Sequence, residues 1–161
     1  MLKKHGEREH AERANDTTGA ETPMKIKLHH VNLCSTNVPA LDAFYRDVLD
    51  MKTEPGLEQS RTPGGGYPGK VSFVTDGTTQ FHLAEKDTNT GFRTGQVVNP
   101  TSHGHIAFRT DDIAAFKQRL DDKGIKYSDY GGWAMSGWHQ IFFYDPDGNV
   151  IEVHQAPEGT A

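Results

Sequence analysis

The chain has 161 residues, and 17 lysines and arginines against 22 aspartates and glutamates give it a formal charge of −5. This length suits one domain with a sizeable core or two small fused units. The acidic balance without a basic block argues against a nucleic-acid partner. No apolar run could span a bilayer or serve as a signal peptide, so we expect a cytoplasmic protein with no membrane partner. The single cysteine, Cys34, excludes an intrachain disulfide.

Residues 1–24 are expected to form a disordered N-terminal tail, because they hold almost no large apolar side chain. Alternation then predicts a strand. The side chains expected on one face are those of Ile26, Leu28, His30 and Asn32, and those on the other are Lys27, His29, Val31 and Leu33. A helix follows, with Thr36 or Asn37 as its N-cap and Pro39 in its first turn.

After this helix the pattern changes to short strands. A segment at 51–54 precedes a loop rich in glycine and proline at 55–69, which we interpret as a mobile surface segment or a lid. Residues 70–75 and 78–85 alternate around Asp76-Gly77 and indicate a hairpin. The first unit, residues 25–85, therefore has the order strand, helix and three strands.

A polar linker, residues 86–102, leads to a second unit at 103–156 with the same order, followed by a short tail at 157–161. The second unit should begin with a strand at 104–110, and its helix should be capped by Asp111 or Asp112 and end at Gly124. Three more strands are predicted. They span residues 125–130, 139–144 and 150–155.

The two units can be aligned residue by residue. Placing His30 on His105, a shift of 75 positions, pairs apolar with apolar residues and cap residue with cap residue without a gap. Near the other end, placing His82 on Glu152 aligns QFHLAE with VIEVHQ. His30 and His105 are thus equivalent, as are His82 and Glu152. Two modules related by pseudo-symmetry could bring these four side chains to one point.

Glu152 follows the turn Asp145-Pro146-Asp147-Gly148-Asn149 in an otherwise apolar strand. Simple alternation could place it in water, on one face with Val150 and His154. Alternatively, three imidazoles and one carboxylate form a suitable ligand set for one divalent ion of zinc, nickel, cobalt, manganese or iron. The coincidence at equivalent positions favours this metal site, with His154 beside it. His29 is expected to point away.

These motifs resemble the vicinal oxygen chelate superfamily, which includes glyoxalase I, methylmalonyl-CoA epimerase, bleomycin-binding and fosfomycin-resistance proteins, and extradiol dioxygenases. The resemblance rests on LHHVNL, FYRDVLDM, GHIAF and FFYDPDGNVIEV, and it covers residues 26–155. It implies an α+β fold of two βαβββ modules that form a curved mixed sheet and a cleft. It also implies a metal held by His30, His82, His105 and Glu152, a small-molecule substrate, and a homodimer.

The resemblance leaves the reaction open. A lyase or isomerase like glyoxalase I ranks first, with Glu152 as both ligand and catalytic base. An Fe(II) extradiol-type dioxygenase ranks second, with His30, His105 and Glu152 as its triad and His139 and Tyr130 as acid and base groups. Antibiotic resistance of the fosfomycin or bleomycin type ranks third, because no basic surface groups Arg61 with other cations.

Overall fold

The structure is a computed structural model, and it describes residues 24–64 and 66–160. The tail expected at residues 1–24 lies outside this range except for Met24. The elements of the first unit are β1 (Ile26–Ser35), α1 (Val38–Leu49), β2 (Lys52–Thr53), η1 (Glu58–Ser60), β3 (Val71–Thr75) and β4 (Gln80–Glu85). The linker contains α2 (Thr90–Thr94), which the sequence did not predict. The second unit has β5 (Gly104–Thr110), α3 (Ile113–Asp122), β6 (Tyr127–Gly131), β7 (His139–Tyr144) and β8 (Val150–Gln155).

All eight strands form one mixed sheet in the order β2-β3-β4-β1-β5-β8-β7-β6. Each unit has a parallel pair, β1 with β4 and β5 with β8, flanked by antiparallel strands. The units join through the antiparallel pair β1 and β5 at the centre. The expected α+β fold of two βαβββ modules is therefore confirmed.

The strand register reproduces the internal repeat. In the first module Asn32 pairs with His82, and in the second Ala107 pairs with Glu152. Asn32 and Ala107 are separated by the same 75 positions that separate His30 from His105. Across the central pair, Asn32 lies opposite His105 and His30 lies opposite Ala107. A pseudo-twofold axis thus passes between β1 and β5.

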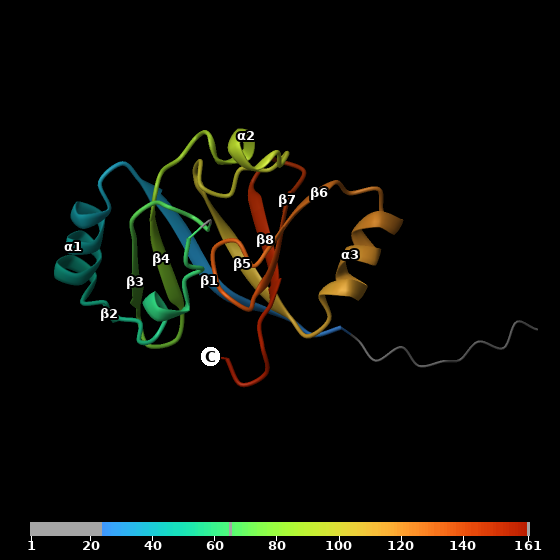
Figure 1. The fold of residues 1–161 in the computed structure, drawn as a ribbon. Coiled ribbons are helices and arrows are strands. Elements are labelled where there is room, and N and C mark those ends of the chain that lie inside the picture. The colour runs from blue at the N-terminus through green and yellow to red at the C-terminus, as the bar shows by residue number, and fades with distance from the viewer. Residues whose placement is uncertain (1–23, 65, 161) are drawn as a thin grey trace, which may run out of the picture.

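Helices α1 and α3 cover one side of the sheet at its two flanks (Figure 1). Val38 of α1 packs with Val74 and Leu83, whereas Ile113 and Leu120 of α3 pack with β7 and β8. The Asn37 side chain caps α1 by accepting a hydrogen bond from the Ala40 N–H at 3.2 Å. The Asp112 side chain caps α3 in the same way, by accepting one from the Ala115 N–H at 2.9 Å. The helices leave the opposite face of the sheet to other segments.

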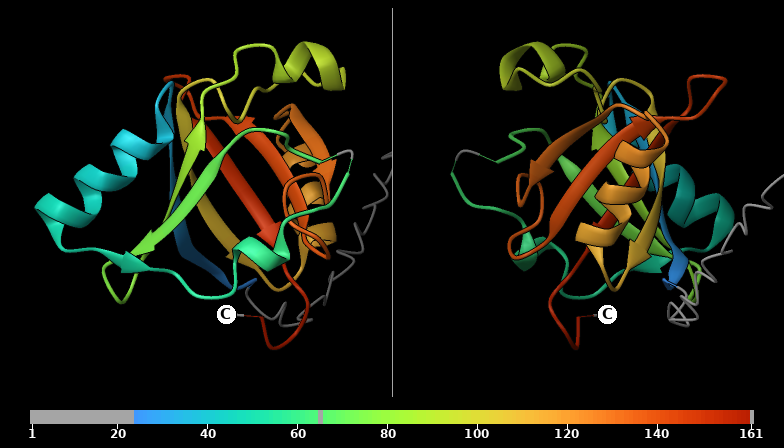
Figure 2. Two further views of the ribbon diagram at one scale, coloured as in Figure 1. Left: turned by 60° about the vertical axis from the view of Figure 1, so that its left-hand side comes forward. Right: turned by 90° about the vertical axis from the view of Figure 1, so that its right-hand side faces the viewer.

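Two connections cross that opposite face, one from each module (Figure 2). The segment between β2 and β3 meets the segment between β6 and β7 through the Thr62 N–H to Ala134 carbonyl bond of 3.1 Å and the Ser136 N–H to Ser60 carbonyl bond of 2.8 Å. Gly66 lies where these segments touch, since a Cβ there would come within 2.5 Å of the Trp133 carbonyl oxygen. The described parts of the 55–69 loop, residues 55–64 and 66–69, thus cover the inner face.

One detail of β1 differs from the alternation predicted for it. The pairing with β5 shifts between Leu28 and His30, so His29 forms a β-bulge. The bulge separates Ile26 and Leu28, which are exposed, from His30, which is buried. It also turns the His29 ring toward His154, with ring centroids 4.8 Å apart. The expectation that His29 points away was wrong.

Candidate metal centre

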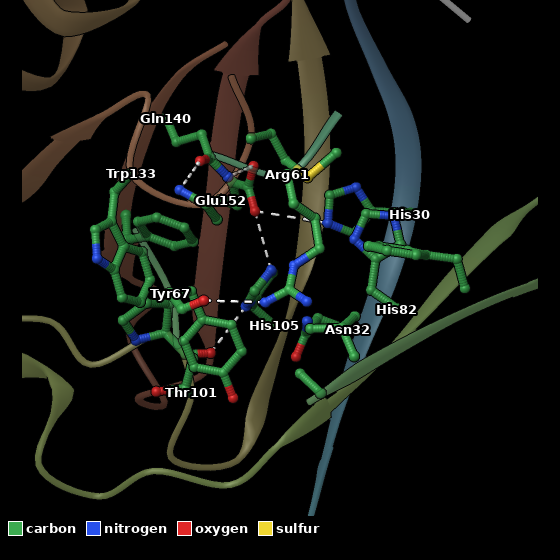
Figure 3. A pocket seen from close by; sticks show the side chains of 17 residues that line it. His30, Asn32, Arg61, Tyr67, His82, Thr101, His105, Trp133, Gln140 and Glu152 are labelled. Atoms are coloured by element: carbon green, nitrogen blue, oxygen red, sulfur yellow. Dashed lines mark hydrogen bonds and ion pairs between the residues drawn. The ribbon is translucent and has the colours of Figure 1, made fainter. Parts of the chain in front are cut away.

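A cavity of about 50 Å³ lies between the inner face of the sheet and the crossing segments. Its polar and charged lining residues come from both modules, and Figure 3 shows them; they are His30, Asn32, Arg61, Tyr67, His82, Thr101, His105, Trp133, Gln140 and Glu152. The remaining wall is apolar and includes Phe73, Met135 and Phe142. Glu152 is 1% exposed, which excludes the interpretation that places it in water.

The Glu152 carboxylate has different surroundings at its two oxygens. Oε1 accepts a hydrogen bond from Gln140 Nε2 at 3.0 Å and lies 3.0 Å from His154 Nδ1. Oε2 lies 2.9 Å from His105 Nε2 and 3.6 Å from His30 Nε2. Two histidines of equivalent strands and one carboxylate oxygen therefore converge on a single point.

The outer contacts of these imidazoles determine which ring nitrogen faces that point. The Pro100 carbonyl lies 3.0 Å from His105 Nδ1, and because a carbonyl only accepts, Nδ1 carries the proton. In the neutral ring, Nε2 then directs its lone pair at Glu152 Oε2. Two acceptors only 2.9 Å apart repel unless a proton or a cation lies between them. This arrangement, with His30 beside it, fits a divalent ion.

His82 lies next to this group but not in it. Its ring stacks on that of His30 with centroids 3.8 Å apart, and its Nε2 lies 3.4 Å from Gln80 Oε1. The three donors that lie within 4.8 Å of one another here are those of His30, His105 and Glu152. The structure thus brings together three of the four proposed ligands.

His154 is fully buried, and it contacts the Glu152 oxygen that faces away from His30 and His105. The guanidinium Nε of Arg109 donates to His154 Nε2 at 3.2 Å, so the proton of the neutral His154 ring is on Nδ1, facing Glu152. Trp138 stacks on the other side of this ring at 4.3 Å, and Arg109 lies over Trp138. These contacts fix the orientation of His154 and, through it, that of the carboxylate.

Burial and hydrogen bonding set the charges of the cluster. Burial lowers the pKa of His30 to about 4, although its contact with Glu152 acts in the opposite direction. Burial also lowers the pKa of His82 well below its usual value. For Glu152 burial would raise the pKa, but its close contacts with His105, His154 and His30 outweigh burial and hold the pKa well below its usual value. Neutral imidazoles and an ionised carboxylate are the forms that bind metals.

Tyr130 and His139, the acid and base groups considered for a dioxygenase, do not line the cavity in the described part of the chain. The Tyr130 hydroxyl donates to the Val98 carbonyl at 2.8 Å, and His139 contacts Asp129 at 2.8 Å on the surface. Sequence reasoning did not identify Gln140 as a partner of Glu152. The signal was available, because Gln140 lies opposite His154, next to Glu152, across the β7–β8 hairpin.

A curved sheet of two βαβββ modules with a histidine and carboxylate cluster on its inner face defines a glyoxalase-fold protein. The model of the Glyoxalase/Bleomycin resistance protein/Dioxygenase superfamily matches residues 27–153. The chain belongs to this superfamily. In the described residues no helix is long and apolar enough to cross a membrane.

Several known proteins are similar over most of their length. The uncharacterized protein YwbC of Bacillus subtilis (strain 168) is 26% identical over 133 residues, which is 82% of this chain and 99% of YwbC. The crystal structure of hypothetical protein BH1468 from Bacillus halodurans C-125 superposes with a TM-score of 0.61 at 20% identity, covering 84% of this chain and 98% of that one. Methylmalonyl-CoA epimerase from Mycobacterium tuberculosis gives 0.54 at 17% identity, with coverages of 80% and 87%. At these identities the structures show a shared fold.

Proposed function

We propose that this protein is a divalent-metal-dependent lyase or isomerase that moves a proton next to a carbonyl group, as glyoxalase I does. The substrate would be a small molecule that offers adjacent oxygens to the metal. The observation that carries this proposal is the convergence of His30 Nε2, His105 Nε2 and Glu152 Oε2 at the inner cavity. The shared fold with methylmalonyl-CoA epimerase supports the same class of reaction.

His30, His105 and Glu152 would hold the ion, and His82 would be the fourth ligand once its contact with Gln80 is released. A bound divalent ion supplies polarisation of the substrate carbonyl and stabilises the negative charge that develops on its oxygen. Neutral His30 and His82 add no charge to the site, so an ion held with ionised Glu152 would keep a net charge of about +1 to act on the substrate.

Glu152 is the only carboxylate among the described residues that line the cavity, and we assign it the proton transfer. Gln140 donates a hydrogen bond to Oε1 and His154 Nδ1 lies 3.0 Å from that oxygen, so Oε2 is the oxygen that would take the proton, and it would have to leave the ion to do so. The contacts of Oε2 with His30 and His105, which lower the pKa of Glu152, must weaken as Oε2 takes the proton. The apolar wall around it, with Phe73 and Phe142, keeps water away and limits loss of that proton to solvent.

Two measurements test this proposal. Elemental analysis of anaerobically purified protein should find nickel, cobalt, zinc or manganese at about one per chain. Proton NMR in D₂O should then show exchange at the carbon next to the carbonyl in a panel of small 2-hydroxy and 2-oxo carbonyl compounds. Metal binding without any exchange across the panel would contradict the lyase or isomerase assignment, and absence of metal binding would remove its basis.

One observation favours a second function, an Fe(II) dioxygenase. Two histidines and one carboxylate are the donor set of non-haem iron oxygenases, and His82 lies outside this set. Iron in the purified protein together with oxygen uptake on a catechol panel would establish this alternative. The positions of Tyr130 and His139 outside the cavity place it second.

Homodimers are common in this superfamily, and we propose one here. Light scattering should give the mass of two chains at micromolar concentration.

A further inference from the structure

Arg61 brings a positive charge to the wall of the cavity, where the other lining residues that the structure describes supply no lysine or arginine. It belongs to the segment that crosses the inner face, and its side chain is 24% exposed. Figure 3 shows it reaching across the cavity with its guanidinium beside Tyr67. The same cavity contains Glu152, His30 and His105, and His82 lies beside them.

The guanidinium is positioned by backbone carbonyls. Nη2 donates to the Tyr67 carbonyl at 3.0 Å and to the Gly69 carbonyl at 2.9 Å. Its acidic contact is Glu58, at 3.4 Å from Nη1, and the Glu58 side chain is 62% exposed. By contrast, Arg46 forms a close ion pair of 2.8 Å with Asp42 on α1. Arg61 is thus held in place while its charge is only weakly compensated.

The charges around the cavity do not balance without an anion. A divalent ion, ionised Glu152 and Arg61 together leave a net charge of about +2 when the histidines are neutral. The neutral walls formed by Phe73, Met135 and Phe142 cannot screen this charge as water would. A negatively charged ligand would remove the imbalance. A neutral one would leave two positive charges facing each other across a partly dehydrated space.

The cavity also limits ligand size. About 50 Å³ corresponds to roughly four water molecules at about 10–15 Å³ each. This space suits a compact acid of a few carbons, and a larger ligand would have to displace the crossing segments.

We propose that the substrate is a small carboxylic acid that presents adjacent oxygens to the metal centre and a separate carboxylate to Arg61. The planar guanidinium matches the geometry of a carboxylate, and one charge from Arg61 plus one from the metal centre can be neutralised by two anionic groups. This inference rests on the proposed metal-dependent function. It adds the class of substrate and makes Arg61 the residue that selects it.

The experiment compares acids that differ only in the second carboxylate. Calorimetry on zinc-loaded protein would compare malate with 2-hydroxybutyrate, and 2-hydroxyglutarate with 2-hydroxyvalerate. Two pairs are used because the diacids differ by one methylene group, and only one of them needs the right length to reach from the metal centre to Arg61. In the wild type, the second carboxylate should tighten Kd at least tenfold for one of the pairs. In Arg61→Gln this gain should fall below threefold, and Arg61→Lys should keep part of it.

The monoacids are the internal control, since they present no second carboxylate to Arg61 and their affinities should fall much less in Arg61→Gln than those of the diacids. An equal gain from the second carboxylate in Arg61→Gln would overturn the inference. Equal weakening of monoacids and diacids would also overturn it, because Arg61 would then only hold the crossing segment in place.

Failure of the proposed function gives a different result. If the diacids bind as expected but no proton exchange is seen, the lyase or isomerase assignment fails and the substrate class stands. If the protein takes up no metal, succinate against butyrate on the metal-free protein still tests Arg61. A gain for succinate that Arg61→Gln abolishes would support carboxylate binding, and no gain would overturn it.

Discussion

Glu152 uses its two carboxylate oxygens for different purposes. Gln140 and His154 fix one oxygen, which leaves the other to face His30 and His105. Because the donor to Oε1 is the uncharged Gln140 amide, with neutral His154 Nδ1 3.0 Å away, the carboxylate keeps its negative charge for a cation. This division explains how a buried acid can stay ionised, as the lowered pKa of Glu152 requires.

Replacing a converging donor should release the metal. His105→Ala and Glu152→Ala are each expected to lower metal occupancy after dialysis to less than a fifth of that in the wild type. His103→Ala is the matched control, because His103 is exposed and lies two residues from His105. Full occupancy in both ligand variants would refute the site. His82→Ala should have a smaller effect if release from Gln80 limits its binding.

The support behind Glu152 can be tested separately. His154→Phe retains a ring between Trp138 and His29 but removes the Nδ1 contact with Oε1. Loss of such an outer partner typically costs about 10–100-fold in metal affinity, and we expect a value in this range from competition with a chelating dye. An affinity equal to that of the wild type would show that Gln140 alone is sufficient.

Stability of the metal-free protein should depend on acidity. Folding lowers the pKa of His30 from 6.5 to about 4, so the unfolded chain binds a proton first as the pH falls. The free energy of unfolding therefore decreases between about pH 6.5 and pH 4 and is unaffected by this group above pH 6.5. At about 1.4 kcal/mol per pKa unit, the loss from His30 is about 3 kcal/mol.

Urea denaturation of chelator-treated protein at pH 7.5, 6 and 5 measures this loss. His30→Phe removes the titrating group, and its profile should be flatter than that of the wild type. Identical slopes for the two proteins would assign the pH dependence to other groups.

Among the strands, the β-bulge at His29 is the element that sequence reasoning missed. Alternation assumes that each residue has one partner on the neighbouring strand, and a bulge breaks this rule without changing the residue types. The four proposed ligands could still be recognised, because they occupy equivalent positions of the internal repeat and the bulge does not change that alignment. The His29 and His154 contact depends on the bulge, so it could not be inferred from the alternation.

The helix caps, by contrast, are evident in the sequence, and they occupy equivalent positions. Asn37→Ala and Asp112→Ala should each lower the free energy of unfolding by about 1 kcal/mol, because each leaves one N–H group of the first turn without its acceptor. Thr36→Ala, at the alternative cap position, should have no measurable effect. Since α1 and α3 lie on the side of the sheet away from the cavity, metal affinity should stay unchanged in all three variants.

At the scale of the whole molecule, the repeat predicted the topology because its two copies share apolar spacing, caps and end turns. The order of the strands and the join between β1 and β5 follow once each unit is βαβββ. The closure of the cavity did not follow. It depends on contacts between the 55–69 loop and the segment before β7, where Arg61 pairs with Met135 across irregular backbone. Such pairing between irregular segments produces no periodic pattern of apolar residues, so the sequence does not predict it.

Because β1 and β5 join the two modules, the proposed metal centre takes its ligands from both of them. His30 belongs to one and His105 and Glu152 to the other, while the covalent connection between them passes through α2, where Phe92 is 92% exposed. A chain cut at Phe92 would become two fragments whose association is favoured by the ion, because only the assembled pair offers all the ligands. Fragment complementation would then increase with free metal concentration, so the cut protein would serve as a metal sensor.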